Sequence, residues 1–206
     1  HRTHMDFSAD LQAQGGIGAK AGKGDPLGGL RLRSLVAKGR WEDDLLTLES
    51  LKADAAGGVL IEGQVKAQPK AQAGSGQFTL RLPGLAAKVK ADMAPAKGQG
   101  ELQAQLGDVA ALQRWVEALP GLADVFGGQS LQGSATLDAT WTGGWQAVQQ
   151  RLSAPDQPLP AGTPEPTLNA KLQVPRLGTR NGSPPAAGAW QVSGLRADAT
   201  GSVEDA

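Results

Sequence analysis

Few side chains in this sequence could act as catalytic acids, bases or metal ligands. The two histidines, His1 and His4, stand in residues 1–5, which read as a vector-derived scar, and cysteine and tyrosine are absent. Histidine and thiolate chemistry therefore has no candidate beyond that scar. The acid pair Asp43–Asp44 could in principle supply a general acid and base, but neighbouring residues on a strand point to opposite faces. A solvated turn after Trp41 is the preferred interpretation, and the sequence predicts no enzyme.

One stretch formally fits a cofactor motif. Residues 16–21, Gly-Ile-Gly-Ala-Lys-Ala, match the dinucleotide fingerprint, which needs a buried strand before it and a helix after it. The preceding segment is half polar, and residues 22–26, Gly-Lys-Gly-Asp-Pro, cannot open a helix. The match is attributed to chance, and no cofactor or metal is expected.

Composition excludes further classes of function. The chain carries 20 basic and 20 acidic residues, so it has no positive field that would hold a nucleic-acid backbone. No apolar run approaches the roughly 20 residues that span a bilayer. Glycine is frequent, at 29 residues, and aromatic residues make up only 4%. These values favour thinly packed sheets that bend, and no nucleic acid is expected as a partner.

The strongest pattern is the alternation of apolar and polar residues, which is typical of half-buried strands. It is longest over residues 131–141. Asp108 is expected to cap a single short helix over residues 108–119, ended by Pro120–Gly121. Trp141 and Trp145 are interpreted as a local packing cluster rather than as recognition anchors. The expected strands cover residues 7–13, 59–67, 77–82, 85–93, 100–106, 131–141, 168–174 and a segment from residue 190, with weaker candidates at 30–36 and 45–51.

These segments predict an all-β fold with one short helix. Gly, Pro and Ser separate the strands instead of helices, which favours an antiparallel meander. Residues 6–152 are expected to form one strand-rich segment, 153–166 a proline-rich loop, and 167–206 its continuation; residues 15–29 and 178–188 are also expected to be loops. Alanine and glycine alternate with larger residues on the apolar side, which predicts a curled sheet with an under-filled hydrophobic interior.

The sequence resembles the TamB family, within the AsmA-like group of bacterial envelope proteins. The similar stretches are residues 131–146 (LQGSATLDATWTGGWQ), 108–122, 168–174 (LNAKLQV) and 100–106 (GELQAQL). The resemblance implies a β-taco, an elongated half-pipe with a hydrophobic interior, in the periplasm and held by an inner-membrane anchor. It also implies a role in envelope biogenesis, through phospholipid transport or outer-membrane protein assembly with the barrel partner TamA. No catalytic residues of the family can be carried over.

The leading hypothesis is a groove that shields phospholipid acyl chains or nascent outer-membrane strands by burial. Each buried methylene group contributes about 0.8 kcal/mol, so such a guest needs no specific polar contact. The alternative is a passive solenoid or adhesin-like spacer with a closed core, although no fixed repeat is found. The residues expected to line the groove are Leu11, Val59, Ile61, Val65, Phe78, Leu80, Leu82, Leu102, Leu106, Leu137, Leu168, Leu172 and Val174.

Overall fold

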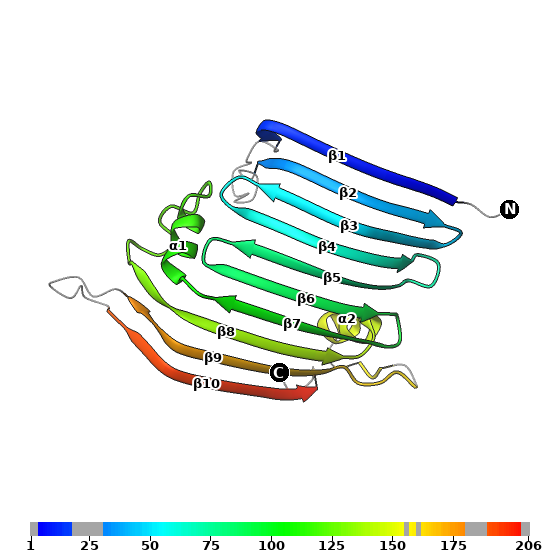
Figure 1. Cartoon of the computed structure of the whole chain (residues 1–206). Coiled ribbons are helices and arrows are strands. Elements are labelled where there is room, and N and C mark those ends of the chain that lie inside the picture. Colours follow the sequence, from blue (N-terminus) through cyan, green and yellow to red (C-terminus); the bar gives the residue numbers. More distant parts are fainter. Residues whose placement is uncertain (1–3, 18–30, 155–156, 160–161, 180–188, 203–206) are drawn as a thin grey trace.

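The computed structural model describes residues 4–17, 31–154, 157–159, 162–179 and 189–202. They form one open sheet of ten strands in the order β1 to β10, in which each strand pairs antiparallel with the next (Figure 1). Two short helices, α1 and α2, lie in the connections before and after β8. The strands are β1 (His4–Ile17), β2 (Leu32–Glu42), β3 (Leu45–Ala55), β4 (Val59–Gln68), β5 (Ala73–Leu82), β6 (Leu85–Met93), β7 (Gly98–Leu106), β8 (Leu131–Thr142), β9 (Thr167–Thr179) and β10 (Gln191–Ser202).

Alternation along each strand and the register between strands together give the sheet one apolar and one polar face. Residues that pair directly across an antiparallel ladder share a face. In β6 and β7 every apolar or glycine position from Leu85 to Met93 and from Gly98 to Leu106 is half-buried, except the polar-face Ala86, and every polar position is exposed. The expected antiparallel meander is therefore confirmed.

Helix α1 (Val109–Glu117) confirms the helix expected at residues 108–119. The Ala111 amide donates to Asp108 Oδ1 at 3.0 Å, so Asp108 is the N-cap, as the sequence indicated. The helix lies at the ends of the strands. Its Trp115 indole contacts Gly57 in the β3–β4 turn, and the backbone of Asp108 lies against Gly84 in the β5–β6 turn.

Helix α2 (Trp145–Ser153) corrects the expectation of a single helix. It occupies residues that were assigned to the strand-rich segment and ends where the proline-rich loop was expected to begin. It has no side-chain cap. Instead, the amides of Trp145 and Gln146 donate to the carbonyls of Ala94 and Pro95 in the β6–β7 turn, both at 3.2 Å. Tertiary contacts replace the capping residue that a sequence pattern can detect.

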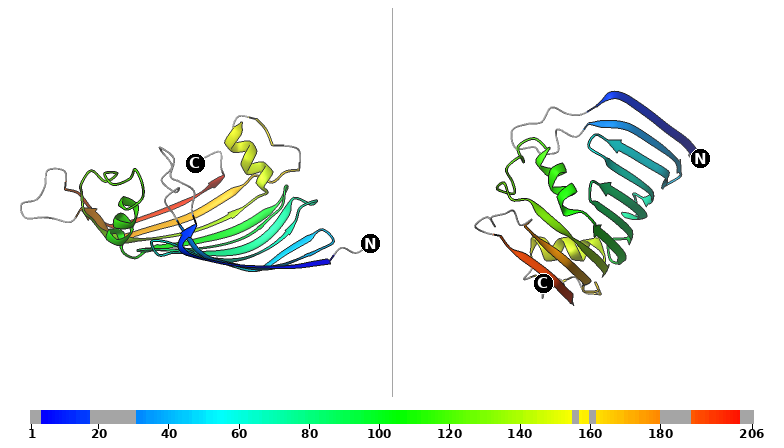
Figure 2. Two further views of the ribbon diagram at one scale, coloured as in Figure 1. Left: turned by 90° about the horizontal axis from the view of Figure 1, so that it is seen from above. Right: turned by 60° about the vertical axis from the view of Figure 1, so that its left-hand side comes forward.

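The strongly curled half-pipe is also corrected, because the sheet is open and only gently bent (Figure 2). Bulges are the local irregularities that bend and twist a sheet. From β4 to β8 the ladders run without any shift of register. Shifts occur only towards the two margins, in the pairings of β1 to β4 and of β8 with β9.

No second layer of secondary structure covers the sheet in the part of the chain that the structure describes. The hydrophobic residues that are buried there are only Val59, Val109, Ala147 and Val174. Figure 2 shows α1 and α2 at opposite ends of the strands, with α2 on the inner side of the bend. The apolar face between the two helices is therefore half-exposed rather than packed as a core.

Candidate functional site: the apolar face of the sheet

All thirteen residues expected to line a groove lie on the same face of the sheet. One row pairs Leu11 with Leu35, and continues through Ala53, Ile61, Leu80, Ala87, Ala104, Leu137 and Leu172. Phe78 and Leu102 lie in the next row, Val65 and Leu168 in the row beyond it, and Leu82, Leu106, Val59 and Val174 lie towards the opposite strand ends. The alternation in the sequence therefore placed these residues correctly on one face.

The exposure of these residues shows how little covers them. Val59 and Val174 are buried, Leu11 and Leu168 are 37% and 39% exposed, and the other nine are half-buried. Half-burial here comes from neighbouring strands and side chains within the same sheet, since the helices reach only its ends. A face of this kind keeps apolar area in contact with water, which disfavours the free protein relative to one with a bound apolar guest.

Aromatic rings lie flat over glycines on this face. Phe7 pairs with Gly39, Phe78 with Gly63, and Trp141 with Gly100, and in each case a methyl group added to the glycine would overlap the ring. An aromatic ring that covers a cross-strand glycine shields the backbone there. The rings therefore lie against the sheet and do not project from its face.

A hollow of about 720 Å³ lies between α2 and the apolar face. Trp141 and Leu168 of the sheet form one side, and Trp145 and Val148 of α2 form the other. None of the residues that line it is charged, and its volume is within the roughly 300–1,000 Å³ typical of small-ligand sites. The complete lining is Met93, Trp141, Thr142, Trp145, Val148, Gln149, Ser153, Pro166, Thr167 and Leu168.

Two indole hydrogen bonds hold the walls of this hollow. The Trp141 indole donates to Met93 Sδ at 3.5 Å, and the Trp145 indole donates to the Gln72 carbonyl of the β4–β5 turn at 3.1 Å. Trp141 and Trp145, which were expected to pack together, both line this hollow. Met93, Val148 and Pro166 were missed, because their part in the hollow depends on α2.

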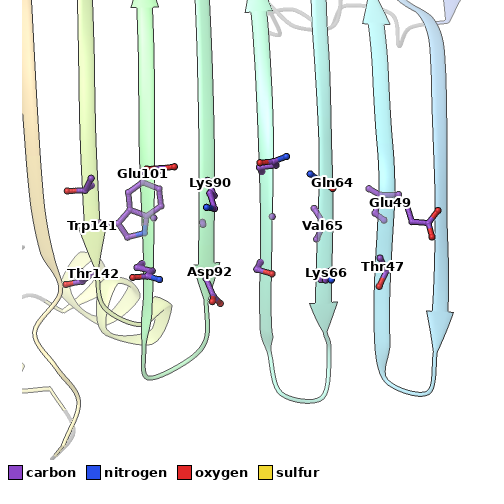
Figure 3. Close-up of a pocket in the computed structure, with 18 residues that line it drawn as sticks. Thr47, Glu49, Gln64, Val65, Lys66, Lys90, Asp92, Glu101, Trp141 and Thr142 are labelled. Atoms are coloured by element: carbon purple, nitrogen blue, oxygen red, sulfur yellow. The ribbon is translucent and has the colours of Figure 1, made fainter.

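The opposite face is polar and carries charges of both signs. A broad hollow of about 850 Å³ crosses β3 to β8 between two rows of side chains (Figure 3). Gln64, Lys90 and Glu101 lie in one row; Lys66, Asp92 and Thr142 lie in the other. The charged residues of the lining are two lysines and three carboxylates, so they do not form a field of a single sign. They are Glu49, Lys66, Lys90, Asp92 and Glu101.

Charged pairs on this face are exposed and join neighbouring strands. Asp6 on β1 accepts hydrogen bonds from Arg40 on β2 at 2.9 Å and from His4 at 3.1 Å. These two bonds, that from Arg40 first, hold the pKa of the Asp6 carboxyl below its ordinary value. His4, expected to belong to a vector scar, begins strand β1 in the structure.

The structure describes only part of the motifs that were set aside. Asp43 and Asp44 lie in the β2–β3 turn, where the Trp41 indole donates to the Asp43 carbonyl at 2.8 Å and Lys70 lies 4.0 Å from Asp44, so the solvated-turn interpretation is confirmed. In the dinucleotide-like stretch, Gly16 and Ile17 end β1, and residues 18–21 lie outside the described residues. Among the described residues, no group of three or more acidic, histidine or cysteine side chains could hold a metal ion.

Comparisons with protein-family models, with curated proteins and with solved structures find no match to this chain. Within the described residues, no helix is long and apolar enough to cross a membrane.

Proposed function

We propose that this chain is a non-enzymatic, lipid-shielding segment whose apolar sheet face takes up phospholipid acyl chains. The observation that carries the proposal is the uncovered apolar face, on which nine of the thirteen predicted residues are only half-buried. Each methylene group that moves from water to this face contributes about 0.8 kcal/mol to the binding free energy. An acyl chain could therefore bind along the face without a polar anchor.

The hollow under α2 is the place where such a guest would bind most tightly. Its uncharged lining, with Trp141 and Trp145 on facing walls, suits an alkyl chain and would exclude a charged headgroup. The headgroup would remain in water beside the strand ends. A gently bent sheet replaces the half-pipe in this proposal, so the guest would be covered on one side only.

The resemblance to the TamB family extends the proposal to a cellular setting. In that setting the chain would lie in the periplasm as part of a protein anchored in the inner membrane, and would shield lipid between the two membranes together with a TamA-like barrel. Nascent outer-membrane strands are the other candidate cargo. The spacer alternative requires a closed core, and the open sheet gives it no support.

Site-specific photo-crosslinking tests the proposal. A photoreactive phenylalanine analogue replaces Leu137 on the apolar face or, as the matched control, its neighbour Asp138 on the polar face. Purified protein is incubated with phospholipid vesicles, or separately with an unfolded outer-membrane protein. We expect phospholipid adducts from position 137 and almost none from position 138. Equal adducts from both positions would refute the assignment, and adducts formed only with the unfolded protein would show that strands are the cargo.

A further inference from the structure

Strand β10 presents a long edge that has no partner within the described residues. It forms one margin of the sheet, with β9 as its only neighbour in the sheet, and β1 forms the other margin (Figure 1). Its residues from Gln191 to Thr200 are all exposed. The outer N–H and C=O groups of such an edge are a template for another strand, which proteins usually block with a short strand, a covering loop or like charges.

The charges on β10 are complementary to themselves. Arg196 and Asp198 flank Ala197 and lie on the polar face, while Leu195, Ala197 and Ala199 lie on the apolar face. If two copies of β10 pair antiparallel about Ala197, Arg196 of each copy faces Asp198 of the other. Leu195 then faces Ala199 of the other copy, and the two apolar faces lie on the same side.

We infer that this chain forms a twofold dimer through β10, with the two strands antiparallel and centred on Ala197. A register that places opposite charges across from each other on a ladder is favoured, and a register that places like charges across from each other is disfavoured. Two symmetric pairs form in this register. The dimer would extend the apolar face without interruption from one copy into the next, whatever guest that face binds.

Two observations favour β10 over β1 as the pairing edge. Arg196 and Asp198 make no ion pair or side-chain hydrogen bond among the described residues, so both are available to a second copy. The polar side of β1 carries Asp6 and Asp10 instead, and a self-pairing centred on Ser8 would place these acids opposite each other. Leu195, 44% exposed in the single chain, would gain an apolar neighbour in the dimer.

Charge reversal tests the register. In analytical ultracentrifugation the unaltered chain should sediment at twice the monomer mass. R196D and D198R should each weaken self-association roughly tenfold to a hundredfold, because two attractive pairs become repulsive in each variant. An equimolar mixture of R196D and D198R should restore the dimer, since every facing pair is then opposite in charge.

The control is Asp10→Arg on β1, which should leave the dimer unchanged. A monomer at all concentrations, or a dimer that R196D does not weaken, would overturn the inference. A series of ever larger species that D10R abolishes would instead indicate head-to-tail pairing of β1 with β10, and would also overturn it. Circular dichroism establishes that each variant is folded before its mass is interpreted.

Discussion

The two ends of the apolar face are closed in different ways. At the α1 end, Gln113 is 7% exposed and its side chain makes hydrogen bonds to Glu117 Oε1 at 2.7 Å, to the Gln129 carbonyl at 2.5 Å and from the Leu131 amide at 2.7 Å. At the α2 end, the helix has no side-chain cap and a hollow separates it from the sheet. The α1 end is fixed by these side-chain hydrogen bonds. The α2 end is held by Ala147 and Pro166, which are buried, and by the bonds of α2 to the β6–β7 turn, and it still leaves a hollow beside the sheet.

Under the proposed function, stability and binding are carried by different ends of the same face. A part-buried polar network fixes the chain between α1 and β8. The apolar contact between α2 and the sheet has less directional constraint than the hydrogen bonds at α1, and it leaves space. In the proposed function, α2 can therefore cover guests of different shapes. Substitutions at the two ends of the face test this difference.

Replacing Gln113 should destabilise the protein most. Gln113→Leu removes all three hydrogen bonds and leaves the Leu131 amide and the Gln129 carbonyl without this partner, which should lower the free energy of unfolding by about 2–4 kcal/mol. Urea denaturation measures the change. The matched control is Gln146→Leu on α2, whose exposed side chain should tolerate the substitution within about 0.5 kcal/mol. Similar losses from both variants would remove the contrast between the ends.

Adding a methyl group at Gly100 should disturb the α2 end. Gly100→Ala would overlap the Trp141 ring and displace it into the hollow, which should cost about 1–3 kcal/mol of stability and weaken binding of a fluorescent fatty acid. Gly107→Ala is the control, because no heavy atom lies within 4 Å of the added group. An unchanged affinity of G100A for the fatty acid would show that the hollow is not the binding site.

Removing the Trp145 indole hydrogen bond should have a smaller effect. Trp145→Phe keeps an aromatic wall but loses the bond to the Gln72 carbonyl, for an expected cost of about 0.5–1.5 kcal/mol. Thermal unfolding followed by circular dichroism would measure it. Trp190→Phe serves for comparison, because Trp190 is 42% exposed and should be nearly silent. A larger loss from W190F than from W145F would contradict this role of Trp145.

Acid pH should reduce the stability of the protein only slightly. The effect should arise at Asp6 on β1 and not at α1 or α2. The pKa of Asp6 is lowered by Arg40 and His4, so its stabilising contribution is present above the pKa of the unfolded chain. That contribution is lost as the pH falls through the lower, folded-state pKa. Because the pair is exposed, Asp6→Asn should slightly reduce stability at pH 7 and flatten its dependence on acid pH. Denaturation curves at several acid pH values would measure this, and an equally steep acid dependence in D6N would assign it to another group.

Alternation alone was enough to predict most of the sheet, because side chains on one face of an antiparallel ladder share a period of two. The regular strands β4 to β8 were found in this way. Strands β2 and β3 gave weaker patterns because a bulge between Leu32 and Ser34 in β2 and another between Leu48 and Leu51 in β3 shift the alternation. The shape of the sheet was not predictable, since it depends on where bulges fall and not on which residues are apolar.

The two helices also show that a local sequence pattern reveals only local partners. Asp108 carries its own capping group, so α1 could be read from the local sequence. The first amides of α2 bond to carbonyls of Ala94 and Pro95, about fifty residues earlier in the chain, and no local pattern reveals such partners. The hollow was missed for that reason, although the sequence correctly placed its sheet residue Leu168 on the apolar face.

Under the proposed function, the middle of the apolar face is open until an apolar guest covers it. The chain contains no cysteine, so single cysteines at Val89 on the apolar face and at Lys88 on the polar face report accessibility without interference. In lipid-free protein both V89C and K88C should react with a maleimide reagent, and phospholipid should slow the reaction of V89C alone. A V89C thiol that is unreactive without lipid, or whose reaction rate phospholipid leaves unchanged, would contradict the account.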